Sequence, residues 1–230
     1  MTNPLTPGVY IEEISTIPPS IAAVETAIPA FIGYTETAEE NKDITALLLK
    51  PTRITSMLEY VEKFGGPKQE YISVTIDDDL DDENKIVNRA ITASISSTLN
   101  YFLYYSVKMF FDNGGGPCYI VSVGDYDTAI SDGDSTTGLK GGIAKLEKVD
   151  EPTLLVFPDA VSLADETLYG GVVISALTLC NKLQDRFTIA DVKVTKNEKY
   201  IKEDIDNYRT ALGLDYLKYG ACYYPFIKTT

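Results

Sequence analysis

The sequence predicts an α/β fold with a mostly parallel or mixed sheet, helices on both faces, an extended N-terminal arm and a surface excursion. From residue 113 onward, short apolar runs alternate with longer segments of helical periodicity, the pattern of strands joined by crossover helices. The first 30 residues hold five of the eleven prolines and neither Lys nor Arg. A polar, acidic stretch near residues 66–84 predicts a surface insertion in the body formed by residues 31–230.

The predicted arm covers residues 1–30. Proline fixes φ and removes a backbone donor, so this stretch is expected to be extended. Between the prolines, residues 9–14 are β-prone and residues 21–24 are apolar. An extended segment cannot bury such side chains by itself. We therefore expect the arm to lie across its own domain or to join the sheet of another chain.

The first half of the body mixes short elements with loops. Residues 30–34 predict a buried strand, and residues 36–50 read as a loop. Residues 55–64 predict a helix with Thr55 or Ser56 as N-cap, stopped by the glycines and proline at 65–67. Residues 71–76 are β-prone.

One long helix is predicted over residues 85–112, with Asn113 and Gly114 as its C-cap. Its apolar side chains recur at spacings of three and four: Ile91, Ile95, Leu99, Phe102, Leu103 and Phe110.

The second half of the body alternates strands with helices. Strands are predicted at residues 118–123, 153–157, 187–192 and 222–227, and helices at residues 141–149, 168–183 and 200–212. The run 153–157 is apolar throughout, which is typical of a central strand. Because the chain stops just after a strand, at Thr230, we expect it to be a fragment of a longer protein.

Composition excludes several functional classes. A formal net charge of −14 disfavours binding to nucleic acid or to an anionic membrane. The absence of histidine removes the commonest general base and zinc ligand. Cys118, Cys180 and Cys222 are far apart, so buried free thiols are expected. The start lacks a secretory signal, and the longest apolar stretch, residues 172–180, is too short to span a bilayer.

No motif for chemistry is complete. The glycines at 114–116 follow a predicted helix and lack the lysine of a phosphate loop, so they predict a turn. Asp159, Asp165 and Asp191 follow or flank predicted strands without a glycine cradle or a base.

The acidic clusters at residues 77–83 and 125–134 lack the spacing of a calcium loop and read as solvated surface. A catalytic carboxylate pair stays open, although no spacing singles one out. We assign no catalytic, cofactor-binding or metal-binding residues. The tyrosines Tyr101, Tyr104 and Tyr105 fit either an interface or helix packing.

Three stretches of the chain form a recognisable series of motifs. The first is TPGVYIEE at residues 6–13, followed by PSI at 19–21 and AFIG at 30–33. The second is FFDNGGG at 110–116 with CYIV at 118–121, and the third is YR at 208–209 with ACYYPF at 221–226. Two shorter matches, ITS and FGG at 54–56 and 64–66 and the Pro158–Asp159 pair, fall between them in order. Together these motifs resemble the contractile tail-sheath family of phages and related injection machines.

The chain departs from the family at three points. Ser122 stands where the family usually has arginine, and Phe226 stands where it has tryptophan. The family's C-terminal domain, which faces the tail tube, would follow the third stretch and is expected to be absent from this chain.

The resemblance implies a structural subunit and no enzyme or cofactor. Such subunits assemble in the cytoplasm, form hexameric rings around an inner tube, join baseplate and terminator proteins, and contract to drive the tube through a target envelope. Strand exchange by the arm implies inter-subunit contacts at Val9, Tyr10, Ile11, Glu12, Glu13, Ile14 and Ile21. Two alternatives stay open, a monomeric tail accessory or capping module and a small α/β enzyme. The sequence leaves open whether the source is a phage, an extracellular injection particle or a secretion system.

Overall fold

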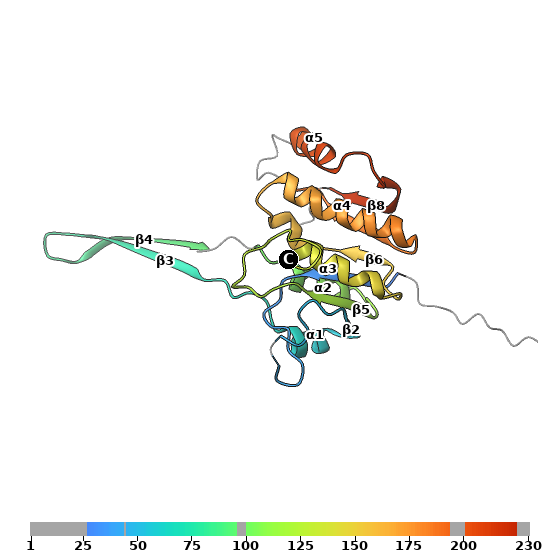
Figure 1. The fold of residues 1–230 in the computed structure, drawn as a ribbon. Coiled ribbons are helices and arrows are strands. Elements are labelled where there is room, and N and C mark those ends of the chain that lie inside the picture. Colours follow the sequence, from blue (N-terminus) through green and yellow to red (C-terminus); the bar gives the residue numbers. More distant parts are fainter. Residues whose placement is uncertain (1–26, 44, 96–99, 194–200, 225–230) are drawn as a thin grey trace, which may run out of the picture.

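The computed structural model describes residues 27–43, 45–95, 100–193 and 201–224. Its centre is a six-stranded sheet in the order β2-β5-β1-β6-β7-β8 (Figure 1). The strands are β1 (Pro29–Gly33), β2 (Thr52–Ile54), β5 (Cys118–Ser122), β6 (Leu154–Val156), β7 (Phe187–Asp191) and β8 (Gly220–Tyr223). Neighbouring strands from β5 to β8 pair in parallel, whereas β2 pairs antiparallel with β5. The sheet is therefore mixed.

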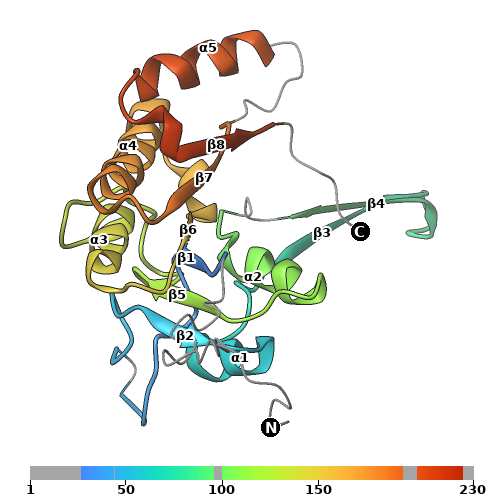
Figure 2. The same ribbon diagram turned by 90° about the vertical axis from the view of Figure 1, so that its right-hand side faces the viewer.

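Helices lie on both faces of this sheet, which confirms the predicted α/β fold. They are α1 (Met57–Phe64), α2 (Leu103–Asp112), α3 (Gly138–Lys145), α4 (Glu166–Leu183) and α5 (Ile201–Leu212). Figure 2 shows α3 and α4 on one side of the sheet and α1 and α2 on the other, next to β1, β2 and β5. Helix α5 packs on α4.

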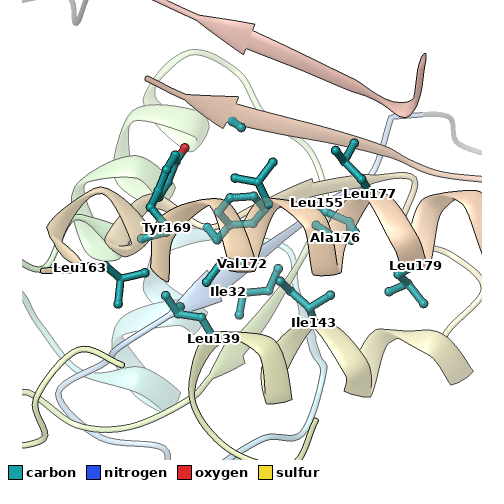
Figure 3. Packing of buried hydrophobic residues seen from close by; sticks show 14 of the residues in the cluster. Ile32, Leu139, Ile143, Leu155, Leu163, Tyr169, Val172, Ala176, Leu177 and Leu179 are labelled. Atoms are coloured by element: carbon teal, nitrogen blue, oxygen red, sulfur yellow. The ribbon is translucent and has the colours of Figure 1, made fainter. Parts of the chain in front are cut away.

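The larger core lies between the sheet and helices α3 and α4. Ile32 of β1 and Leu155 of β6 are fully buried there, and Figure 3 shows them beside Ile143 and Val172 of the two helices. Alternation along each strand places every second side chain on this face. The opposite side chains, such as Phe31 and Ile120, join a second core with α1 and α2.

Helix α3 approaches the sheet closely because Gly142 has no side chain. A Cβ at this position would lie 2.6 Å from both Ile32 Cγ2 and Val123 Cγ1. We expect Gly142→Ala to lower the free energy of unfolding by about 1–3 kcal/mol through overpacking. The matched control is Gly171→Ala in α4, where the added Cβ meets only the flexible end of Lys140, at 3.1 Å. Better helix propensity should make that variant neutral or up to about 1 kcal/mol more stable. Urea unfolding measures both, and equal losses would contradict the close approach.

The predicted elements agree with most of the described sheet. Helix α1 begins after Ser56, whose Oγ accepts a hydrogen bond from Glu59 N at 3.2 Å. The predicted glycine turn is confirmed, since Gly114 has φ 82° and donates to Phe111 O. Strand β2 was not predicted, because three residues give no periodic pattern. Cys118 and Cys180 are buried as expected, but the expectation is wrong for Cys222, which is exposed.

The long helix predicted over residues 85–112 is wrong. Among its described residues only α2, in the last third, is helical; Ile86–Ile95 forms strand β4, which pairs antiparallel with β3 (Ile72–Leu80). Ile91 and Ile95 are four apart, a spacing that fits a helix and equally fits one face of a strand. The β-branched residues Ile86, Val87, Ile91, Thr92 and Ile95 favour the strand. The insertion expected near residues 66–84 overlaps this hairpin.

Candidate interaction surface

A ligand crevice in a sheet of this order would lie at the carboxyl ends of β1 and β6, where the strand order reverses. This position is occupied by the chain's own Asp159, which lies just beyond β6 and is fully buried. Its Oδ2 accepts a hydrogen bond from Tyr34 N at 2.7 Å. Its Oδ1 accepts from Phe102 N at 2.5 Å and Leu103 N at 3.0 Å, at the start of α2. Asp159 therefore joins β1, β6 and α2.

Three of the other carboxylates considered from the sequence also accept hydrogen bonds from backbone N–H groups. Asp165 is the N-cap of α4 and accepts from Leu168 N at 2.8 Å. Asp125 accepts from Thr128 N at 2.9 Å, and Asp134 accepts from Thr136 N at 2.7 Å. Burial raises the pKa of Asp191, at the end of β7. Among the described residues, no three His, Cys, Asp or Glu side chains are grouped so that they could hold a metal ion.

Asp159 makes stability depend on pH. Burial raises its pKa from 3.8 to about 6, against the lowering effect of the three backbone N–H donors. Because the pKa is higher in the folded state, its stabilising contribution is complete below about pH 4 and is lost as the pH rises through about 6. The difference between the two pKa values corresponds to at most about 3 kcal/mol.

The Asp159→Asn variant tests this titration. We expect the unfolding free energy of the unmodified chain, minus that of the variant, to fall by up to about 3 kcal/mol between pH 4 and pH 7. Urea unfolding at both pH values measures the difference, in which other titrating groups cancel. A difference that stays constant would contradict the raised pKa.

The most prominent surface feature is the β3–β4 hairpin, which projects from the body (Figures 1 and 2). Every residue of both strands is exposed. The pairing register places apolar side chains opposite one another on one face: Ile72 with Ile95, Val74 with Ala93 and Ile76 with Ile91. The other face is polar, with Ser73 opposite Ser94 and Thr75 opposite Thr92. We call these the apolar face and the polar face of the hairpin.

The far end of the hairpin is acidic. Six carboxylates lie within residues 77–83: Asp77, Asp78, Asp79, Asp81, Asp82 and Glu83. Asp81 forms the turn, because its Oδ1 accepts from Glu83 N and Lys85 N at 3.0 and 2.9 Å. Arg89 pairs with Asp78 across the strands, with Nε 2.6 Å from Oδ1. We call residues 77–83 the acidic tip.

The root of the hairpin is fixed on the body by polar and aromatic contacts. On the outgoing side, Gly66 O accepts from Tyr126 Oη at 3.0 Å. On the returning side, Tyr101 Oη donates to Thr128 O at 2.9 Å, and its ring lies 5.0 Å from that of Tyr126. Lys68 Nζ sits 4.5 Å from the centre of the Tyr101 ring and thereby joins the two sides. These contacts hold Gly66, Lys68 and Tyr101, on the two sides of the hairpin, to the body.

The sequence left open whether three tyrosines near this root serve an interface or helix packing. Tyr101 is buried in the root, and Tyr104 packs edge-on against Tyr60 with ring centres 5.9 Å apart. Tyr105 is 40% exposed. Packing explains the first two, and Tyr105 remains available at the surface.

A second apolar surface lies between α4, α5 and the edge strand β8. It is a groove of about 380 Å³ lined by Leu177, Tyr208, Leu212, Leu217 and Cys222, among others. Strand β8 is the last strand of the sheet order. None of the helices in the described ranges is both long and apolar enough to cross a membrane.

The residues expected to exchange strands lie outside the part of the chain that the structure describes. They are Val9, Tyr10, Ile11, Glu12, Glu13, Ile14 and Ile21, and their contacts stay predictions. The hairpin was missed as a surface, although the alternation of Ile72, Val74 and Ile76 signals a strand with one apolar face. Ser122 stands where the tail-sheath family usually has arginine. It is buried, and its Oγ lies 2.6 Å from Thr35 Oγ1.

Comparison with known proteins gives a structural match only. No family model matches the chain, and a search of curated proteins finds no significant relative. Chains of solved structures do match, among them the following two. One is a cryo-EM structure of the anti-feeding prophage baseplate, six-fold symmetrised: 25% identity, TM-score 0.51, covering 96% of this chain and 46% of that chain. The other is that baseplate in its contracted state: 19% identity, TM-score 0.52, covering 96% and 47%.

These neighbours are components of a contractile injection system. The chain is therefore similar to a structural part of such a system, and it spans less than half the length of the chains that it matches. The resemblance seen in the sequence is supported at the level of a contractile tail system. The sheath family itself stays a prediction.

Proposed function

We propose that this chain is part of a sheath-type structural subunit of a contractile injection particle and has no enzymatic role. The observation that carries the proposal is the match of 96% of the chain to a chain of the anti-feeding prophage baseplate, at 25% identity. The subunit would polymerise in hexameric rings around an inner tube and contract to drive it through a target envelope. Its partners would be neighbouring subunits, the tube, and baseplate and terminator proteins, with assembly in the cytoplasm.

The geometry of the body supports a structural role. The position where a sheet of this order would bind a ligand is filled by Asp159, which is tied to three backbone N–H groups. A body braced in this way can keep its shape while its contacts with neighbours change, as in a switch between two packings of the same units. Contacts between unlike surfaces of identical subunits do not close in pairs, so they form rings or helices.

The arm of residues 1–30 would keep the subunits connected by adding a strand to a neighbour's sheet. Its β-prone run includes Val9, Tyr10 and Ile11. Deleting residues 1–20 from the full natural protein is expected to abolish tube formation. Formation of normal tubes without these residues would contradict the strand-exchange role of the arm.

A second candidate is a baseplate or accessory component of the same kind of particle. It is favoured by the fact that both solved structures described above are baseplate structures. Negative-stain microscopy of the full natural protein discriminates the two. Long tubes support the sheath role, whereas discrete rings or single subunits support the baseplate role. Absence of the chain from purified particles, measured by mass spectrometry, would overturn both.

A further inference from the structure

We propose that the apolar face of the β3–β4 hairpin docks on a different protein of the same particle, on an apolar surface bordered by Lys and Arg side chains. The inference rests on the proposed function and names the chemistry of one partner. It concerns the described hairpin and not the N-terminal arm.

The first support is the exposure of the apolar face. Ile72, Val74, Ile76, Ile91 and Ile95 are between 55% and 69% exposed, although their register gathers them on one side. An isolated two-stranded hairpin is at best marginally stable in water, because it has no third layer to bury its apolar side. Contiguous apolar surface of this kind, rimmed by polar residues, is typical of a protein–protein contact.

The second support is charge. The segment Ile72–Ile95 contains the six carboxylates of the acidic tip and two basic residues, Lys85 and Arg89. Its formal charge is therefore −6 + 2 = −4. Arg89 is already paired with Asp78, which leaves the tip strongly negative. Complementary potentials fix the register of an interface, and like charges oppose one. A basic border suits this tip, whereas a second copy of a chain with formal charge −14 does not.

The third support is the set of contacts at the root. Contacts of Lys68, Tyr101 and Tyr126 hold residues on both sides of the hairpin to the body. Binding by an element whose base already has partners on its own body loses less conformational freedom than binding by a loose loop. The root therefore lowers the entropic cost of docking the apolar face.

The chain offers a matched pair of positions for the test. Val74 points to the apolar face and Thr75, its neighbour, points to the polar face. Both lie in an exposed strand, so a substitution at either position should leave the body folded. A photo-crosslinking residue, benzoylphenylalanine, is placed at Val74 or at Thr75 in the full natural protein. Purified particles are irradiated, and the crosslinked peptides are identified by mass spectrometry.

We expect a product from Val74 at several-fold the yield from Thr75, on a peptide of another particle protein that contains Lys or Arg beside apolar residues. We also expect Val74→Asp to prevent incorporation into particles, and Thr75→Asp to leave incorporation unchanged.

Three results overturn the inference: a Val74 product on a second copy of this chain, a product on a peptide without basic residues, or equal yields from the two positions. In each of these the chain is still present in the particle, so the proposed function stands. If the chain is missing from purified particles, both the inference and the proposed function are overturned.

Discussion

Asp159→Ala is expected to destabilise the body more than any other single carboxylate substitution in the described part of the chain. The change leaves the buried N–H groups of Tyr34 and Leu103, and the partly buried N–H of Phe102, without their acceptor. Each buried donor left unpaired costs about 1–3 kcal/mol, so a total loss of at least about 3 kcal/mol is expected. For a chain of this size that lowers the melting temperature by roughly 6–12 °C. Urea and thermal unfolding at pH 4, below the raised pKa of Asp159, measure the loss, because burial of the ionised carboxylate would offset part of it at pH 7.

The control for this variant is Asp165→Ala. Asp165 also accepts a backbone hydrogen bond, from Leu168 N, but it caps a helix at the surface. Loss of such an N-cap costs about 1 kcal/mol. Similar losses in the two variants would show that burial of the Asp159 carboxylate adds nothing, contrary to the structure.

Excision of the hairpin is expected to abolish incorporation into particles while leaving the body folded. Lys68 and Tyr101 are in contact at the root, so a short Gly-Ser linker can replace residues 71–99, which keeps Asn100 and its contact with Ser162. The removed strands are fully exposed; their loss should change the free energy of unfolding by less than about 1 kcal/mol. Incorporation into particles should be lost, because the apolar face goes with them. Urea unfolding and quantification of the chain in purified particles measure the two effects.

The matched control keeps the hairpin and carries Thr75→Asp on the polar face, with incorporation expected to be normal. A linker variant that still enters particles would show that the hairpin is dispensable. A linker variant that fails to fold would contradict the independence of body and hairpin.

The sheet was predictable because its strands are buried and therefore consist largely of apolar residues. Strands such as Cys118–Ser122 and Leu154–Val156 are flanked by helices on at least one face and read as apolar runs. The hairpin lacks that constraint, since every residue of its two strands is exposed in the described part of the chain. Its spacing of Ile91 and Ile95 therefore fitted a helix as well as a strand, and only the register with β3 decides between them.

The candidate surface was less predictable than the fold. Asp159 stood out as a carboxylate after a strand, but two of its hydrogen bonds come from the start of α2. The sequence prediction merged α2 with the second strand of the hairpin into one helix over residues 85–112, so this contact could not be foreseen. The apolar face needs two strands in register, a pairing that the local sequence does not specify. The arm contacts depend on another chain, so they stay predictions.

Asp159 has a mechanical consequence for the hairpin. The returning chain is fastened at Phe102 and Leu103 to a residue just beyond β6, which neighbours β1 in the middle of the sheet. A load applied at the acidic tip would reach the central strands and would be shared by several hydrogen bonds at once, instead of peeling an edge strand away bond by bond. Pulling a single molecule from Asp82 against the body should then show a higher rupture force than the same experiment on Asp159→Ala. Equal forces would mean that the load follows another path through the root.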